Sequence, residues 1–190
     1  MEKSRCPWCL GFSDYIDYHD REWGVPVHDD RVHFEFLVLE GAQAGLSWAT
    51  ILKKRAGYRK AFSDFQPEKI ARFSEGKVQK LLQNPDIIRN QSKIRSTLNN
   101  ARKFLQVQQE FGSFDRYIWA FTGGKIIQNH WEDMREIPAT SPISNALSVD
   151  LKSRGFKFVG STTLYAHLQA CGLINDHLVS CFRYAELHSK

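Results

Sequence analysis

The sequence lacks any run of about 18 apolar residues, which excludes a membrane-spanning helix, and we expect no membrane partner. It has only 4 cysteines in 190 residues, and its first residues lack the apolar core of a signal peptide. We therefore expect a protein of a reducing cytoplasm, in which cysteines bind metal or stay free and form no disulfides.

Signals of β-structure are also scarce. Asn-Gly and Asp-Gly pairs, which favour tight hairpins, are missing, and apolar and polar residues show no sustained alternation. The chain is 42% hydrophobic, 13% aromatic and 25% charged, a balance that excludes disorder, collagen and coiled coil. We expect one all-α domain over residues 1–190.

Charge is distributed unevenly along the chain, whose formal net charge is +5. Residues 1–50 carry 4 basic and 9 acidic side chains, residues 51–110 carry 14 and 5, and the remainder carries 8 and 7. A cationic middle third suits a polyanion such as nucleic acid, because bound phosphates release counterions. A solvated helical surface has the same composition, so this pattern alone leaves both interpretations open.

Apolar residues recur at helical spacing nearly throughout. Ile94, Leu98, Ala101 and Leu105 form one stripe of a helix over residues 92–110, which Gly112 ends. Other helices are expected at 32–44 after the capping residues Asp29 and Asp30, and at 47–62, 67–73, 74–83, 114–121, 143–154, 161–171 and 175–184. Glycines and prolines break the segment 122–142, and helices on both sides of it favour two lobes with a cleft.

His177 and Cys181 are four residues apart, so they would share one face of the expected helix 175–184 and could bind one ion. Zinc in a structural site takes four cysteine or histidine ligands, and Cys6 and His19 would complete the set and join the chain ends. The alternative is an ordinary buried histidine and a small core cysteine. Cys6 and Cys9 also form a C-x-x-C pair, which could bind metal together; a redox role is disfavoured, because such motifs follow a strand.

Glu40 is the only charged residue between Glu35 and Lys53, and helical spacing places it on one face with Phe36 and Gln43. A carboxylate among apolar neighbours has a raised pKa unless a cationic or hydrogen-donating ligand compensates it. Aromatic residues crowd the same third of the sequence: Tyr15, Tyr18, Trp23 and Trp48. Together they could hold an extruded nucleobase by stacking, whereas a solvated glutamate and an aromatic core are the alternatives.

The segment LKSRGFKFVGSTTLY predicts a helix that ends at Gly155, a turn that ends at Gly160, and a helix capped by Ser161 or Thr162. Free backbone N–H groups at such a turn bind anions. Arg154 and Lys157 would add positive charge. The segment is therefore a candidate phosphate site.

Taken together, the blocks YIDYHDREWGVP, LEGAQAGLSW, LKKRAGYRKAF, IIRNQSKI, RGFKFVGSTTLYAHLQACGLINDH and HLVSC resemble the 3-methyladenine DNA glycosylase I family over nearly the whole chain. The resemblance implies a two-lobed helix-hairpin-helix fold. It implies one structural zinc on Cys6, His19, His177 and Cys181, joining the N- and C-terminal segments. It also implies a base pocket with Glu40 as the catalytic carboxylate, bounded by Tyr15, Tyr18, Gln43 and Trp48.

The function implied by the resemblance is hydrolysis of the N-glycosidic bond of 3-methyladenine in double-stranded DNA, leaving an abasic site and the free base. Leu46 is the expected wedge that fills the vacated stack, by analogy with other proteins that deform DNA. Lys157, Gly160, Ser161 and Thr162 are the expected DNA contacts. A monomer of the bacterial cytosol or nucleoid is expected, without strand cleavage, because the hairpin has no obvious nucleophilic lysine.

Three residues depart from the expected pattern. Phe158 replaces the earlier hairpin glycine, Cys9 is an additional thiol, and Asn175 occupies the position where the wider superfamily has its catalytic aspartate. Asp176 beside it could take that role. Two alternatives stay open, namely a catalytically silent DNA-binding protein and a glycosylase of altered lesion range, such as 3-methylguanine.

Overall fold

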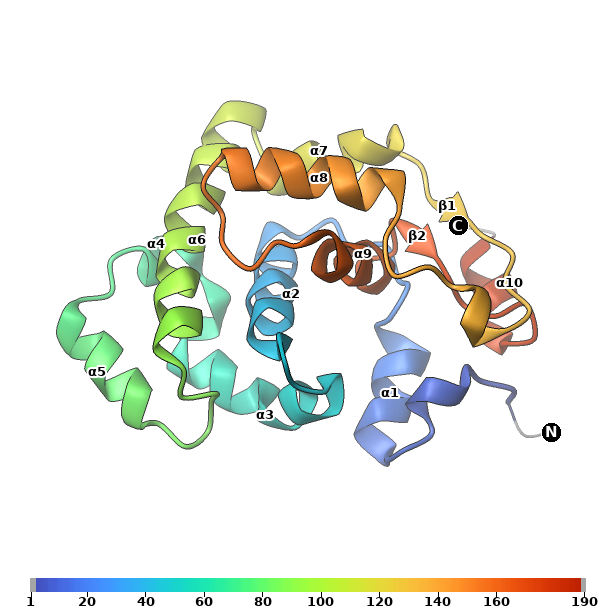
Figure 1. The fold of residues 1–190 in the computed structure, drawn as a ribbon, viewed down its shortest axis with the longest axis horizontal. Helices are drawn as coiled ribbons and strands as arrows, with labels where there is room; N and C mark the ends of the chain where they lie inside the picture. Colours follow the sequence, from blue (N-terminus) through green and yellow to red (C-terminus); the bar gives the residue numbers. More distant parts are fainter. Residues whose placement is uncertain (1–2, 189–190) are drawn as a thin grey trace.

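The computed structural model describes residues 3–188, which form a mostly helical structure around a central buried helix (Figure 1). That helix, α2 (Asp30–Gln43), packs against α3 (Trp48–Ala61), α6 (Gln91–Phe111), α7 (Phe114–Trp119) and α9 (Ser161–Ala170). Residues 33–42 of α2 are all buried. Every polar group on this helix therefore needs a partner within the protein.

The other elements surround this centre. The helices are α1 (Ser13–Arg21), α4 (Pro67–Ile70), α5 (Glu75–Gln83), α8 (Pro142–Ser153) and α10 (Phe182–His188), with 3-10 turns η1 (Pro7–Cys9), η2 (Ser63–Phe65), η3 (Ala120–Thr122) and η4 (Met134–Glu136). Two short strands, β1 (Ile127–Gln128) and β2 (Ile174–Asn175), pair in parallel. Among the described residues, no helix has the length and apolar character needed to cross a membrane.

The expected helix signals are confirmed for the central elements. The Asp29 side chain accepts a hydrogen bond from the Arg31 backbone and caps α2. The stripe of α6 is buried at Ile94, Leu98 and Ala101, and the helix ends at Gly112, whose φ of 85° is left-handed. Local pattern therefore determines the ends and the buried faces of these helices.

The expected helix over residues 175–184 is wrong. Asn175 belongs to β2 and pairs with Gln128 of β1, while residues 176–181 form turns and a bridge before α10 begins at Phe182. The Asn175 side chain also donates to the Gln128 side chain and accepts from the His177 backbone N–H, at 3.0 and 3.2 Å. These local bonds compete with a helix. Helix α1 was not expected, because its segment was interpreted only for its aromatic residues.

The turn between α8 and α9 is tied to α6. The Asn100 amide bonds both the N–H and the C=O of Lys157, each at 2.8 Å, and Asn99 donates to the Gly155 carbonyl at 2.8 Å. Phe158 has a left-handed φ of 57°, which explains why glycine is the usual residue there. The helix, turn and helix expected from the sequence are therefore present, with a strained phenylalanine in the turn.

Gly172 is where the chain after α9 crosses the segment before α2. A Cβ at Gly172 would lie 2.4 Å from the Pro26 nitrogen, and the φ of Gly172 is 72°. We predict that Gly172→Ala lowers the free energy of unfolding by about 3 kcal/mol or more, because overpacking and left-handed strain add. Chemical denaturation measures this loss.

The matched control is Gly123→Ala, since Gly123 has a φ of 65° but no atom within 4 Å of a new Cβ. It should lose only about 1 to 2 kcal/mol. Equal losses for the two variants would contradict the close approach at Gly172.

Candidate active site

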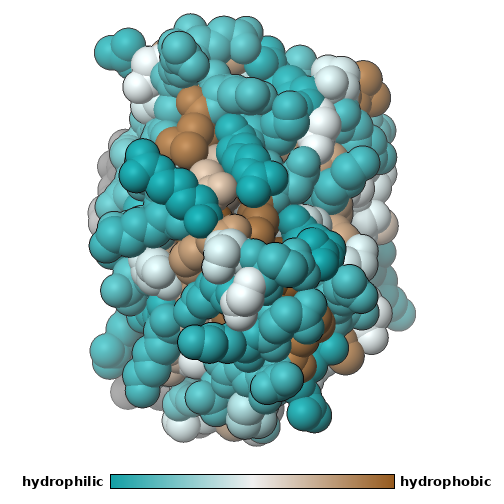
Figure 2. Space-filling model, turned by 90° about the vertical axis from the view of Figure 1, so that its left-hand side faces the viewer, coloured by the Kyte–Doolittle hydropathy of each residue, from teal (hydrophilic) through white to brown (hydrophobic). Residues whose placement is uncertain are grey.

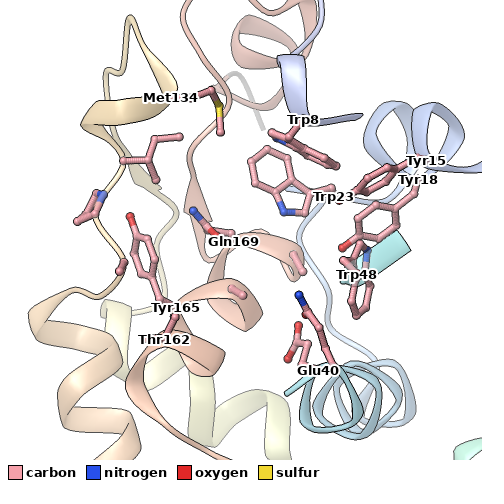
Figure 3. Close-up of a pocket in the computed structure, with 16 residues that line it drawn as sticks. Trp8, Tyr15, Tyr18, Trp23, Glu40, Trp48, Met134, Thr162, Tyr165 and Gln169 are labelled. Atoms are coloured by element: carbon pink, nitrogen blue, oxygen red, sulfur yellow. The ribbon is translucent and has the colours of Figure 1, made fainter. Parts of the chain in front are cut away.

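A pocket of about 360 Å³ opens between the N-terminal third of the chain and α9 (Figure 3). Glu40 and Gln43 of α2 lie at its base. One wall is aromatic and is made by Trp8, Tyr15, Tyr18, Trp23 and Trp48. The opposite wall contains Met134, Ile137, Pro138, Ala139, Thr162, Tyr165, Ala166, Gln169 and Ala170.

The predicted pocket residues therefore meet in space. Tyr15, Tyr18, Gln43 and Trp48 all line the same cavity as Glu40. The tyrosines come from α1, and Trp48 begins α3 immediately after the loop that follows α2. The sequence interpretation missed Trp8 and the whole wall that α9 and η4 provide.

The aromatic wall is a packed cluster of rings that line the pocket. The centroids of Trp8 and Tyr15 lie 5.1 Å apart, those of Trp8 and Trp23 lie 5.0 Å apart, and those of Tyr18 and Trp48 lie 5.5 Å apart at a tilt of 49°. Burial, followed by the nearby Glu40, raises the pKa of Tyr18 well above its ordinary value. The wall is thus neutral and suits a flat aromatic ligand.

Glu40 is 4% exposed, and only one of its two oxygens has a partner. Oε2 lies 2.9 Å from Nδ1 of His167 on α9, whereas Oε1 has no hydrogen-bond partner in the part of the chain that the structure describes. Burial raises the pKa of Glu40 well above its ordinary value. The Trp48 Nε1–H group is also buried and unpartnered among the described residues. One free acceptor and one free donor in a pocket are groups that a polar ligand can satisfy.

Asp176 holds the second wall together and does not face the pocket as a free carboxylate. Its Oδ2 accepts from the Tyr165 hydroxyl at 2.6 Å and from the Gln169 amide at 2.7 Å. Its Oδ1 accepts from Asn129 at 2.7 Å and from the Trp131 indole at 2.8 Å. With four donors on two oxygens, Asp176 orients Tyr165 and Gln169 and has little capacity left for a proton transfer.

Cys6, His19, His177 and Cys181 form a compact buried cluster, as the sequence analysis expected. Their ligand atoms all lie within 4.8 Å of one another. Cys181 Sγ is 3.5 Å from His19 Nε2 and 3.5 Å from His177 Nδ1, and Cys6 Sγ is 3.7 Å from the same His177 nitrogen. Ligands of one tetrahedral zinc are separated by about 3.5 Å. The cluster joins residues near both ends of the chain, although His177 and Cys181 lie in the irregular segment after β2 and not on a helix.

The other nitrogen of each histidine is already engaged. His19 Nδ1 lies 2.8 Å from Asp20 Oδ1, and His177 Nε2 lies 3.2 Å from the Trp23 carbonyl. Donation to these oxygens leaves His19 Nε2 and His177 Nδ1 free to bind metal, an arrangement typical of metal-binding histidines. Hydrogen bonds from Cys6 first, then His177 and His19, lower the pKa of the Cys181 thiol. These residues fit a zinc ion.

Cys9 lies outside this set. Its thiol donates to the Cys6 carbonyl at 3.1 Å, and burial raises its pKa to about 11. A second buried group, His33, His167 and Cys171, also brings three metal-type donor atoms together behind Glu40.

The predicted DNA-contact residues occupy two separate places. Leu46 is 42% exposed in the loop between α2 and α3, next to the pocket. At the start of α9, the N–H groups of Gly160, Ser161 and Thr162 have no acceptor within residues 3–188. The Ser161 hydroxyl, however, bonds Ser144 and Asn145 of α8 at 2.8 and 2.5 Å.

The two basic residues near the hairpin differ in exposure and in pairing. Lys157 is exposed, whereas Arg154 is paired with Asp150 at 2.6 Å and with Glu110 at 2.7 Å. Two carboxylates therefore already pair with the positive charge that the sequence analysis expects Arg154 to add.

Some basic side chains of the middle third stabilise the fold through hydrogen bonds within the protein. Lys93 donates to the carbonyls of Ala42 and Ala44 at the end of α2, at 2.8 and 2.6 Å. Burial lowers the pKa of Lys93. Lysine at a helix C-terminus stabilises the free carbonyls there. The side of the molecule that carries α4, α5 and α6 is nevertheless mostly hydrophilic (Figure 2).

An aromatic pocket with a buried carboxyl group, beside a turn that presents free amides, has the features of a site for a base extruded from a nucleic acid. The family model described as methyladenine glycosylase matches residues 8–184. The chain belongs to this methyladenine glycosylase family.

Known relatives are similar over nearly their full length. A DNA-3-methyladenine glycosylase of Haemophilus influenzae is 46% identical over 178 residues, which cover 94% of this chain and 96% of that protein. DNA-3-methyladenine glycosylase 1 of Escherichia coli is 47% identical and covers 95% of this chain and 96% of its own length.

Solved structures of this family have the same fold as this chain. A crystal structure of 3-methyladenine DNA glycosylase I has a TM-score of 0.92 and 48% identity, and the match covers 94% of this chain and 98% of that one. A variant of 3-methyladenine DNA glycosylase I in complex with 3-methyladenine has a TM-score of 0.91 and 36% identity, with 94% and 96% covered.

The bonding of Asp176 generates a prediction. Replacing Asp176 with asparagine puts an N–H group where two donors already point, so Asp176→Asn should lower the free energy of unfolding by at least about 2 kcal/mol. Asp17→Asn, on the exposed face of α1, is the matched control and should change it by less than about 0.5 kcal/mol. If Asp176→Asn abolished base release while its denaturation curve stayed at the wild-type position, Asp176 would be a reacting group and the structural role would be wrong.

Proposed function

We propose that this protein removes 3-methyladenine from alkylated double-stranded DNA by hydrolysing the N-glycosidic bond, and releases the free base and an abasic site. The observation that carries the proposal is the unpartnered Oε1 of buried Glu40 at the base of an aromatic pocket. Such a pocket fits a flat base with a hydrogen-bond donor on its edge. The relative whose structure contains 3-methyladenine, at 36% identity, supports the same ligand.

Base flipping brings the reacting bond to the pocket. Extruding a nucleotide costs a few kcal/mol and is easiest for a damaged base. Leu46, exposed beside the pocket, would enter the vacated stack. The free amides of Gly160, Ser161 and Thr162, with Lys157, would bind the phosphate backbone. We infer that the protein does this as a monomer in the bacterial cytosol or nucleoid.

Cleavage of this glycosidic bond needs little catalytic assistance, so the main task of the protein is to select the methylated base. Methylation at N3 makes adenine cationic, which weakens its bond to deoxyribose and makes it a good leaving group. Tyr15, Tyr18 and Trp48 would stack on the base, and their ring faces attract its positive charge. Glu40 would accept a hydrogen bond through Oε1. Water completes the hydrolysis, and we propose no covalent Schiff-base step, which requires a lysine amine at the sugar.

We propose that Cys6, His19, His177 and Cys181 hold one structural zinc. With four protein ligands, such an ion has no open position for water and serves as a cross-link. The cluster brings α1 and the segment after β2 side by side, and the rings of His19 and His177 contact Trp8 and Trp23 of the pocket wall, at 5.3 and 4.5 Å between centroids. The zinc site would therefore support the pocket wall without taking part in the reaction.

The role of Glu40 can be tested by truncation. Glu40→Ala removes the acceptor at the pocket base, so release of 3-methyladenine should fall by about 100-fold, which corresponds to roughly 3 kcal/mol. Chromatography of bases released from methylated duplex DNA measures this, and affinity for undamaged duplex should stay within about twofold. Glu68→Ala, at an exposed position of α4, is the control. Tight DNA binding without base release by the wild type would favour the silent DNA-binding alternative.

The zinc proposal predicts a metal content of about one zinc per chain. Cys181→Ser should lose most of it and melt at a lower temperature, because metal binding to such sites is coupled to folding. Cys9→Ser and Cys171→Ser are matched controls, since both thiols are buried and lie outside the cluster. Elemental analysis that found full zinc in Cys181→Ser, or none in the wild type, would refute the site.

A further inference from the structure

Two fully buried histidines stand behind Glu40, outside the lining of the pocket. His167 of α9 lies 2.9 Å from Glu40 Oε2 through Nδ1, and 3.4 Å from His33 Nδ1 through Nε2. His33, on α2, lies 3.1 Å from the Val27 carbonyl through its own Nε2. Three hydrogen bonds thus run in series from a backbone carbonyl to the pocket carboxylate.

The carbonyl at one end fixes the direction of every bond in the series. The Val27 oxygen can only accept, so His33 Nε2 must donate to it. A neutral imidazole has one N–H, which makes His33 Nδ1 an acceptor for the N–H on His167 Nε2. His167 Nδ1 is then an acceptor too, so Glu40 Oε2 must be the donor.

Both imidazoles are neutral. Burial and the facing His167 lower the pKa of His33 to about 3, and burial lowers the pKa of His167 to about 3. The raised pKa of Glu40 agrees with a protonated carboxyl group. The hydrogen-bond directions and these pKa shifts therefore indicate the same protonation state.

We propose that His167 and His33 are positioning residues that keep Glu40 a neutral carboxylic acid, with its proton on Oε2 and Oε1 left as a bare acceptor for the base. The proposal deepens the proposed function and rests on Glu40 being the base-binding residue. It assigns recognition of an N–H group on the base to Oε1, and recognition of positive charge to the aromatic wall.

Other titratable groups around the series do not replace it. Cys171 Sγ lies 3.7 Å from His167 Nε2, and burial, followed by Glu40, raises its pKa well above the ordinary value. Asp115 Oδ1 lies 3.8 Å from His33 Nε2 and also bonds His28. Within the described residues, His167 is the one partner of Glu40. The remaining groups whose charges reach this region are Asp30, which acts on His33, and Tyr18, Arg55 and Glu22 beside the pocket.

A metal on His33, His167 and Cys171 is the competing use of the same atoms. It would need a thiolate and a fourth ligand. Only three such donor atoms meet there within the described residues, and hydrogen bonds already engage both histidines. The observations therefore favour the hydrogen-bonded series over a second metal.

The test uses His33→Leu and His33→Gln in the full-length, zinc-loaded protein. Leucine removes the acceptor for His167 Nε2–H, so His167 should switch to the tautomer that donates from Nδ1 to Glu40. That bond favours the carboxylate, and the pKa of Glu40 should fall by at least about one unit, a tenfold change in the equilibrium. Glutamine offers one acceptor and one donor, as the neutral imidazole does, and should restore the wild-type state.

Three measurements report the protonation states of His33, His167 and Glu40. Nitrogen-15 NMR reports which nitrogen of His167 and His33 carries the proton, and infrared spectroscopy reports the carboxylic acid C=O stretch that Glu40→Gln removes. The pH profile of kcat/KM for 3-methyladenine release should show no Glu40 ionisation near the ordinary pKa of a glutamate in the wild type. In His33→Leu the rate should change with pH where the carboxylic acid band disappears. Glu40→Gln, whose amide can donate to His167 and accept from the base, should lose at least about tenfold less activity than Glu40→Ala.

A proton on His167 Nδ1 in the wild type, an absent carboxylic acid band, or an unchanged band in His33→Leu would overturn the proposal. So would a second metal ion per chain that His33→Leu removes. If His33→Leu does not fold, the wild-type spectra and His33→Gln still decide the outcome. The spectra do not depend on catalysis: the expected tautomers in a protein that releases no 3-methyladenine would refute the proposed function and leave the hydrogen-bonded series in place.

Discussion

The burial of α2 on all sides is the constraint on which the rest of the structure depends. A helix buried from residue 33 to 42 must satisfy each of its polar side chains inside the protein. Glu35 is matched by Arg55 and Arg59 of α3, at 2.6 and 3.0 Å. His33 and Glu40 are matched through one residue of α9. Among the described residues, Oε1 of Glu40 is the one buried polar side-chain atom of α2 without a hydrogen-bond partner, and Glu40 lines the pocket. The functional group of the helix therefore lies where its hydrogen bonding is incomplete.

The second half of the pocket depends on the segment after α9. Asp176 orients two side chains of α9 and two of the segment 129–131, while β1 and β2 hold these stretches in register. A residue later, His177 joins the cluster that fixes α1. Two adjacent residues thus support opposite walls of the pocket. Asp176 supports the wall that α9 provides, and His177 supports the aromatic wall that includes α1. Few side chains in the segment 174–181 are free to change without moving one of the two walls.

Much of this could be predicted from the sequence where the signal is local. Caps and stripes determined the helices from α2 to α9, and the isolation of Glu40 among apolar residues marked the pocket. The turn at 176–181 could not be predicted, because its conformation depends on bonds from Asn175 to Gln128 and to its own neighbours. His33 and His167 are separated by 134 positions, and each alone resembles an ordinary core histidine. The cysteine and histidine cluster was grouped correctly although the helical reason for it was wrong, because four residues of turn bring two side chains together as one helical turn does.

The two walls of the pocket also come from opposite ends of the chain, with consequences during synthesis. The aromatic wall is complete once residue 48 has been made, but it faces nothing until α9 exists, and residues 176–181 follow α9 by only a few positions. A nascent chain that ends before α9 would have α2 and its carboxyl group without the helix that covers them. The pocket lining therefore requires nearly the whole chain, from Trp8 to Ala170, and Asp176 just beyond it orients two of the lining side chains.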